Sequence, residues 1–116
     1  MQEAARKIAA MGAKHVLIKG GHRVGSDAAD LLYGDGKFIR LQTARIDTEH
    51  THGTGCTLSS AIACRLALGD SAEDAVRTAK DYITQAITDA YPVGGGNGPV
   101  GHLAELYRKA GMEVFL

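Results

Sequence analysis

The stretch THGTGCTLSSAIA, residues 51–63, joins a glycine turn directly to an apolar run that is typical of a helix. Gly53 and Gly55 carry no side chain, so the backbone there can approach another group closely. Backbone N–H groups at the start of a helix lack partners within it, and the helix dipole adds positive potential, so such a turn binds anions. We therefore expect an anion site at this turn, made by the N–H groups of Thr54, Gly55 and Cys56.

Cys56 stands at the point of this turn where the helix dipole favours the thiolate over the thiol. A thiolate there can accept a proton from an incoming hydroxyl group. The other interpretation is that Cys56 is a small buried residue and that the glycines only make a tight turn, because short motifs also occur by chance. The residues of the turn alone leave both interpretations open.

Size and charge limit the classes of function. At 116 residues the chain is large enough for one domain with a hydrophobic core. Its 13 Lys and Arg balance 13 Asp and Glu, so no charge excess favours nucleic acid or an anionic membrane as a partner. No apolar run approaches the roughly 20 residues that cross a bilayer, and the first residues lack the order of a signal peptide. We expect a cytoplasmic protein that acts on a small molecule.

The first half of the chain predicts a helix followed by strands. Residues 4–11 are predicted as a helix that ends before a glycine, and residues 15–19 as a short buried strand that ends at a glycine pair. Residues 30–33 and 37–41 flank a Gly-Asp-Gly turn. They predict a β-hairpin, because polar and apolar residues roughly alternate after the turn.

The second half predicts helices. One is expected over residues 54–68, and another begins at Ser71, where an acidic residue three positions later completes a capping-box pattern. Apolar residues at three- and four-residue steps predict that the second helix buries one face, Tyr82 included. Cys64, inside the first helix, is expected in the core as well. A last short helix is predicted over residues 103–109.

This order of elements is typical of an α/β protein with helices packed on a sheet. The chain offers about three strands, fewer than the ~5–6 of a typical sheet. It is therefore either part of a larger fold or completes its sheet with another copy, which favours a homo-oligomer such as a dimer. Cys56 and Cys64 lie roughly 12 Å apart along one predicted helix, too far for a disulfide, and two free thiols favour a reducing compartment.

Two common nucleotide motifs do not fit. The P-loop needs Ser or Thr after Gly-Lys, but Gly36-Lys37 is followed by Phe38. The dinucleotide fingerprint needs a third glycine where Leu58 stands, and a strand directly before the turn. The anion site at residues 53–56 is therefore of another kind.

Three segments, in their order and spacing, resemble the C-terminal portion of the hydroxymethylpyrimidine/phosphomethylpyrimidine kinases. They are VLIKGGH at 16–22, THGTGCTLS at 51–59 and GPV at 98–100. These kinases of thiamin biosynthesis are members of the ribokinase-like superfamily, and the resemblance extends over nearly the whole chain. It implies the C-terminal part of a ribokinase-like three-layer α/β/α fold, with residues 1–116 as a single partial domain on the nucleotide side of the site.

The resemblance also implies a reaction and the residues that carry it. Most sugar kinases of the superfamily have Asp as the catalytic base where Cys56 stands, so Cys56 is implied to replace it. Gly53, Thr54, Gly55 and Cys56 are implied to form the anion hole around the transferred γ-phosphoryl group. The reaction implied is phosphoryl transfer from ATP, with Mg²⁺, to 4-amino-5-hydroxymethyl-2-methylpyrimidine and then to its monophosphate. The family's Asn-x-x-Glu element, which helps to organise magnesium, is absent here, and no residue of this chain is implied as a metal ligand.

Further residues are implied to bind ATP. Lys19, with Gly20 beside it, is implied to face the phosphates. Val93, Gly98 and Val100 are implied to line the nucleotide pocket. Without the resemblance, a lysine at the end of a buried strand is more simply a charge that reaches solvent.

Several alternatives stay open. A related vitamin-alcohol kinase of the pyridoxal type is one, because the family's specificity residues lie outside this chain. A non-catalytic binding or assembly module that uses an exposed sheet edge is another. A third is a cysteine-nucleophile enzyme in which His50 or His52 activates Cys56, although that leaves Lys19 unexplained. The spacing of these histidines and Cys56 matches no zinc pattern.

Overall fold

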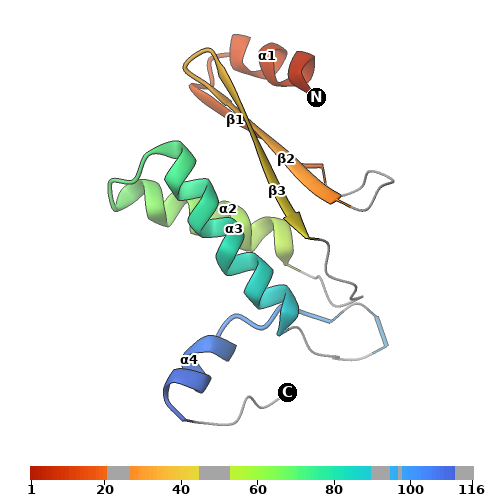
Figure 1. Ribbon diagram of the computed structural model, residues 1–116, viewed down its shortest axis with the longest axis vertical. Helices are drawn as coiled ribbons and strands as arrows, with labels where there is room; N and C mark the ends of the chain where they lie inside the picture. The colour runs from red at the N-terminus through yellow and green to blue at the C-terminus, as the bar shows by residue number, and fades with distance from the viewer. Residues whose placement is uncertain (21–26, 45–52, 90–94, 97, 112–116) are drawn as a thin grey trace. The chain divides into compact units, whose positions relative to one another are not determined.

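The computed structural model describes residues 1–20, 27–44, 53–89, 95–96 and 98–111. The chain divides into two compact units, Met1–Arg45 and Ile46–Leu116, and each is described by itself. In the described ranges, the first unit contains one helix and a sheet, and the second contains three helices (Figure 1).

The first unit is a helix on a small antiparallel sheet. Helix α1 spans Gln2–Ala10, and strands β1, β2 and β3 span His15–Ile18, Asp27–Gly34 and Lys37–Ala44. The strands are hydrogen-bonded in the order β1-β2-β3, and both pairings are antiparallel. Helix α1 packs on β1 and β2 (Figure 1), so the predicted order of helix, strand and hairpin is confirmed.

The hairpin turn between β2 and β3 follows from two residues. Gly34 pairs with Lys37, which leaves Asp35 and Gly36 as the loop. Both have positive φ, 51° and 71°, as a two-residue type I′ turn requires. Asp is one of the few non-glycine residues that adopt this conformation readily, so the turn needs no compensation elsewhere.

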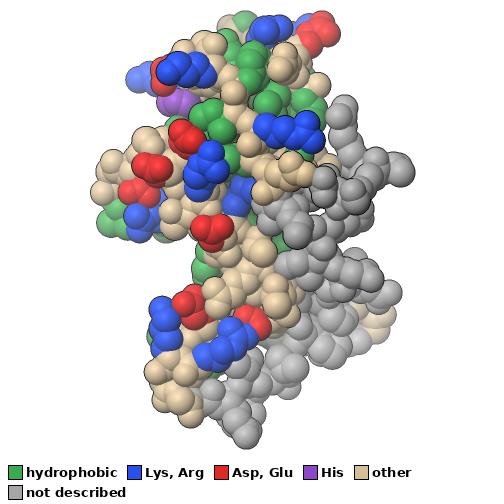
Figure 2. Space-filling model, in the orientation of Figure 1, with side chains coloured by type: hydrophobic (Ala, Val, Ile, Leu, Met, Phe, Trp, Pro, Cys, Tyr) green, Lys and Arg blue, Asp and Glu red, His purple; other side chains and the backbone are tan. Residues whose placement is uncertain are grey.

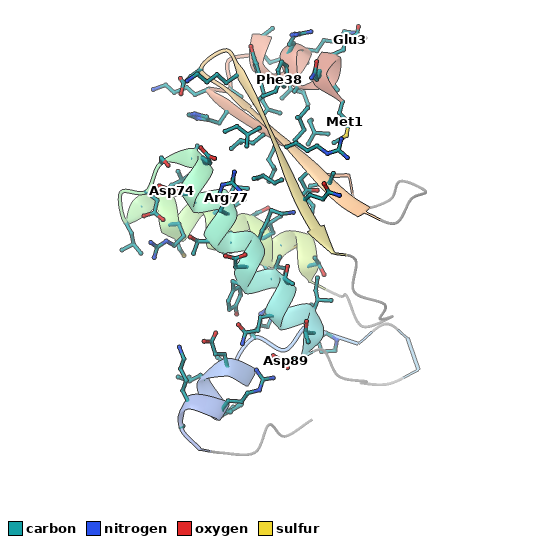
Figure 3. All side chains as sticks on the ribbon, viewed as in Figure 1. Met1, Glu3, Phe38, Asp74, Arg77 and Asp89 are labelled. Carbon is teal, nitrogen blue, oxygen red and sulfur yellow. The ribbon has the colours of Figure 1, made fainter. Side chains whose placement is uncertain are left out.

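The sheet of the first unit has buried apolar side chains on both faces. Val16 and Leu31 lie on one face and Leu32 and Leu41 on the other, and Ala5 is the buried residue of α1. Together they form the apolar core of this unit. At its rim the rings of Tyr33 and Phe38 lie 4.6 Å apart, and the guanidinium of Arg6 lies 5.0 Å from the centre of the Phe38 ring (Figure 3).

The expectation that residues 15–19 form a buried strand holds only in part. Val16 is buried, but Leu17 and Ile18 are half-buried and His15 and Lys19 are exposed. Within the described residues β1 is an edge strand, so nothing shields its outer side as neighbouring strands would.

The second unit contains helices α2 (Thr54–Ala67), α3 (Ala72–Thr88) and α4 (Ala104–Lys109). The predicted boundaries are confirmed by their local geometry. The hydroxyl of Ser71 accepts a hydrogen bond from the Asp74 N–H at 3.2 Å, which is the expected N-cap. Gly69, with φ +99°, follows the C-terminal end of α2, where glycine is favoured.

Helices α2 and α3 pack side by side and enclose the core of the second unit (Figure 1). The buried face of α3 has the predicted three- and four-residue spacing: Ala75, Val76, Ala79, Ile83 and Ala86. Leu58 is the buried residue of α2. Val100 is 1% exposed and is the largest fully buried side chain described.

Two residues expected in the core are exposed. Cys64 is solvent-exposed, and Tyr82 is 39% exposed. Both lie along the same open groove beside the α2–α3 contact, because the packing of these helices buries a narrower stripe than their apolar composition predicts.

Charged side chains of both signs are interspersed on the face of the molecule seen in Figure 2, as the balanced composition predicts. Among the residues that the structure describes, no helix has the length and apolar character that crossing a membrane requires.

Candidate active site

The turn predicted to bind an anion lies at the N-terminus of α2. Gly53 is its N-cap, with φ +88° and ψ 3°. The first hydrogen bond at this end runs from the Thr57 N–H to the Gly53 carbonyl, at 2.9 Å. The N–H groups of Gly55 and Cys56 therefore precede the first helical hydrogen bond, and no side chain of Gly53 caps this end. Such donors at the positive end of a helix dipole suit an anionic group.

Gly53 and Gly55 differ in the physical factor that favours glycine at each position. Gly53 has a left-handed backbone conformation, which a side chain disfavours. Gly55 lies inside the helix, and a Cβ built there meets no described atom within 4 Å. Packing does not require glycine at 55, where alanine would favour the helix. Among the described atoms, glycine at that position leaves the space next to its own N–H group open.

Cys56 has a free, exposed thiol one residue further along α2. It lies at an open groove of about 590 Å³ within the second unit. The groove is lined by residues of α2 and α3 and by the segment before α4: Cys56, Thr57, Ser60, Ala61, Cys64, Arg65, Thr78, Ala79, Tyr82 and His102. The interpretation of Cys56 as a small buried residue is therefore wrong for this structure.

A charged pair lies beside the groove. Nε of Arg65 donates to Oδ2 of Asp70 at 2.7 Å, and Nη2 of Arg65 donates to Oδ1 at 3.1 Å. The side-chain hydrogen bonds that Arg65 donates to Asp70, and next the negative charge of Asp70, raise the pKa of Arg65 above its usual value. Arg65 therefore presents a permanent positive charge near the groove.

The segment at residues 98–102, part of which is implied to line the nucleotide pocket, is hydrogen-bonded to α3. The Gly101 N–H donates to the Ala86 carbonyl at 2.8 Å, and the Tyr82 hydroxyl donates to the His102 carbonyl at 3.0 Å. Gly98 and Val100 are buried in this segment. A Cβ at Gly101 would lie 2.3 Å from the backbone oxygen of Asp89, so only glycine fits there.

A further contact in this region lies at the C-terminal end of α3. Arg108 of α4 donates to Oδ1 of Asp89, which is the C-cap of α3 (Figure 3). Val93, the remaining residue implied to bind the nucleotide, lies outside the described residues.

Lys19 and Gly20 belong to the first unit, directly after β1. Lys19 is exposed and Gly20 is buried. The Gly20 N–H donates to Oδ1 of Asp30 at 2.9 Å. Sequence reasoning did not assign a role to Asp30, although an acidic residue next to the apolar pair Leu31 and Leu32 is a signal that something other than packing selects it.

The family model of phosphomethylpyrimidine kinase matches residues 1–101. The chain belongs to the phosphomethylpyrimidine kinase family. This confirms the family that the segments at 16–22, 51–59 and 98–100 indicate, and with it the ribokinase-like α/β class.

Relatives within and beside the phosphomethylpyrimidine kinase family are kinases. The chain is 53% identical over 102 residues to a hydroxymethylpyrimidine/phosphomethylpyrimidine kinase of Streptomyces coelicolor, covering 88% of this chain and 38% of that enzyme. It is 42% identical over 105 residues to a pyridoxine kinase of Bacillus subtilis, covering 90% of this chain and 39% of that enzyme.

Solved structures of kinases also match. A pyridoxal kinase of Staphylococcus aureus, in complex with AMP-PCP and pyridoxal, aligns with a TM-score of 0.86 at 37% identity, covering 90% of this chain and 39% of that one. The chain thus spans about two fifths of the length of these kinases.

Proposed function

We propose that this chain contributes the phosphoryl-transfer and nucleotide side of an ATP-dependent kinase of thiamin biosynthesis. Its substrates are 4-amino-5-hydroxymethyl-2-methylpyrimidine and the monophosphate of that alcohol. The observation that carries the proposal is the N-terminus of α2, where N–H donors, open space at Gly55 and the exposed thiol of Cys56 adjoin one another. The names of the Streptomyces coelicolor relative and of the matching family model support the substrate class.

The proposed chemistry uses these groups in one step. Bound ATP supplies the γ-phosphoryl group. The substrate hydroxyl oxygen forms a bond to the γ-phosphorus, the bond from that phosphorus to the β–γ bridging oxygen breaks, and ADP leaves. The thiolate of Cys56 accepts the hydroxyl proton. The N–H groups at residues 53–56 stabilise the charge that builds on the phosphoryl oxygens, and such donors are worth roughly 3–4 kcal/mol each.

The remaining predicted residues bind ATP in this proposal. Lys19 contacts its phosphates from the end of β1, where the adjoining Gly20 lets the backbone approach β2. Val93, Gly98 and Val100 form part of the nucleotide pocket. Tyr82 and Ala86 support that role for Gly98 and Val100, because their hydrogen bonds hold the segment against α3.

In this proposal Mg²⁺ binds to the site together with ATP. The described ranges contain no group of three or more His, Cys, Asp or Glu side chains suited to hold a metal ion. The proposed roles of this chain involve the phosphates and the proton only.

A pyridoxal-type kinase is the second candidate function. It is favoured by the 42% identity to the Bacillus subtilis pyridoxine kinase and by the Staphylococcus aureus structure named for its complex with pyridoxal. Both classes phosphorylate a hydroxymethyl group on an aromatic ring, so the same turn serves either substrate.

Residues 1–116 are proposed to form one partial domain of this kinase. The second unit exposes large apolar side chains, Leu66, Leu68, Leu103 and Leu106, at 47% to 73%, as expected of surfaces that further protein covers. Another copy of the chain, as a dimer, is the proposed source of that cover. The two free thiols favour a reducing compartment, the cytoplasm.

The test is a kinase assay on the 116-residue chain with Mg-ATP and three acceptors: the hydroxymethylpyrimidine, its monophosphate and pyridoxal. Products are separated by chromatography. We expect phosphorylated pyrimidine, loss of most turnover in Cys56→Ala, and unchanged turnover in Cys64→Ala, which removes an exposed thiol two turns further along α2. Product from pyridoxal alone would favour the second function. Absence of product, with a melting temperature that rises with protein concentration and ignores ATP, would favour a non-catalytic assembly module.

A further inference from the structure

We infer that Asp30 is a positioning residue for Lys19. Its carboxylate binds the backbone N–H of Gly20 and so sets the direction in which the chain leaves β1. The inference rests on the proposed function in one respect, the binding of nucleotide phosphates by Lys19. The anchoring of Gly20 is a property of the fold and is tested separately.

Among the residues that the structure describes, Asp30 is the one buried residue with a charged side chain. It is 3% exposed, in the central strand of the sheet. Its ladder partner in β3 is Leu41, which is also 3% exposed, and the next residues along β2 are the buried Leu31 and Leu32. A carboxylate in such surroundings costs free energy unless hydrogen bonds compensate it. Packing alone would therefore favour an apolar side chain at this position.

The register of the sheet places Asp30 next to the predicted phosphate-binding residue. The β1–β2 pairing ends with Ile18 opposite Leu31. Lys19 and Asp30 are the residues next to this last pair. The hydrogen bond from the Gly20 N–H shows that the Asp30 carboxylate reaches the peptide that joins Lys19 to Gly20.

Gly20 makes this contact possible. A Cβ at Gly20 would lie 1.9 Å from the backbone oxygen of Ala29. The backbone at Gly20 therefore lies too close to β2 for any residue that has a side chain. The same approach brings the Gly20 N–H to 2.9 Å from Oδ1 of Asp30. The peptide between Lys19 and Gly20 is thus fixed from one side by close packing and from the other by a buried acceptor, while the Lys19 side chain stays exposed.

Two substitutions separate the acceptor from the charge. Asp30→Asn keeps an oxygen acceptor of the same shape and removes the charge. Asp30→Leu removes the acceptor and matches the neighbouring leucines, so it buries no unpaired charge but leaves the Gly20 N–H without this acceptor. Leu41→Ala is the matched control, because it leaves a cavity beside Asp30 in the same sheet without touching Gly20.

The first measurement is the hydrogen-exchange rate of the Gly20 amide, by NMR on the nucleotide-free 116-residue chain. We expect exchange to be about tenfold faster in Asp30→Leu and close to wild type in Asp30→Asn, since protection follows the opening free energy of that hydrogen bond. Leu41→Ala should lower the urea midpoint but change the local opening of the Gly20 amide much less than Asp30→Leu does. Unchanged exchange in Asp30→Leu would overturn the anchoring.

The second measurement is the dissociation constant for ADP. We expect Asp30→Leu and Lys19→Met each to weaken binding by about tenfold, and the double variant to be no weaker than Lys19→Met alone, because Asp30 acts through Lys19. Additive losses, or an equal loss in folded Leu41→Ala, would overturn the positioning role. If wild type binds no ADP, the proposed function fails at Lys19 while the exchange data still decide whether Asp30 anchors Gly20.

Discussion

The hydroxyl of Tyr82 donates a hydrogen bond to the backbone carbonyl of His102, at 3.0 Å. Tyr82 belongs to the apolar series of α3, yet it is 39% exposed and its polar end serves the segment before α4. Together with the bond from the Gly101 N–H to Ala86, it attaches the predicted nucleotide-binding segment to the helix that forms the core.

Tyr82→Phe should destabilise the second unit. The substitution removes one hydrogen bond and keeps the ring, so we expect a loss of about 1 kcal/mol in the free energy of unfolding. Urea denaturation measures it. Tyr107→Phe is the control, because the Tyr107 hydroxyl makes no hydrogen bond to a described residue and its loss should change little. Equal stability of both variants would show that the Tyr82 bond contributes nothing.

The two glycines at the start of α2 should respond in opposite ways to alanine. Gly53→Ala forces a side chain into a left-handed conformation, which costs about 1–2 kcal/mol. Gly55→Ala adds a methyl group to open space in a helix and should stabilise by up to about 1 kcal/mol. Thermal unfolding of the two variants gives these values.

Gly55→Ala should also weaken binding of the ATP analogue AMP-PCP despite its greater stability, because the added methyl group occupies the space beside the N–H donors proposed to hold the γ-phosphoryl group. Titration calorimetry on the folded variant measures this. A variant that is more stable but binds the nucleotide with wild-type affinity would contradict a phosphate site at this turn, because a methyl group beside the N–H donors would then not hinder the phosphate.

Both cysteines should react with a thiol reagent in the native protein. Cys56 and Cys64 are each exposed and unpaired, so Ellman's reagent should titrate both without denaturant, and one in either Cys→Ala variant. If Cys64 reacted only after unfolding, it would be a core residue as its helical position suggests. A rate for Cys56 that falls when ADP is added would place the nucleotide next to its thiol.

The Arg65–Asp70 pair should be insensitive to pH on the alkaline side. Hydrogen bonding to Asp70 raises the pKa of Arg65. A group whose pKa is raised by folding contributes its full stability below its unfolded pKa and loses it only as the pH rises through the folded value. From about pH 7 to about pH 10 the difference in melting temperature between wild type and Asp70→Asn should therefore stay constant. A difference that shrinks over that range would contradict the assignment.

Much of the fold was predictable because its signals are local. The cap at Ser71, the Asp35-Gly36 turn and the glycine at 69 each act within a few residues of themselves. The position of the turn predicted to bind an anion is local as well, since Gly53 and Cys56 lie three residues apart at the start of α2. The roles of Lys19, Val93, Gly98 and Val100 as ATP contacts stay predictions.

The sequence by itself determined the order of the helices and the hairpin, the position of the hairpin turn, and the turn at which a cysteine follows two glycines. Tertiary structure alone decided which sides of those elements are covered. Cys64 and Tyr82 fit an apolar pattern but face an open groove, whereas the acidic Asp30 is buried. The physical reason is that periodicity describes one element, while burial depends on the partner that packs against it. The partner of Asp30 is Gly20, ten residues away along the chain and 2.9 Å from its carboxylate.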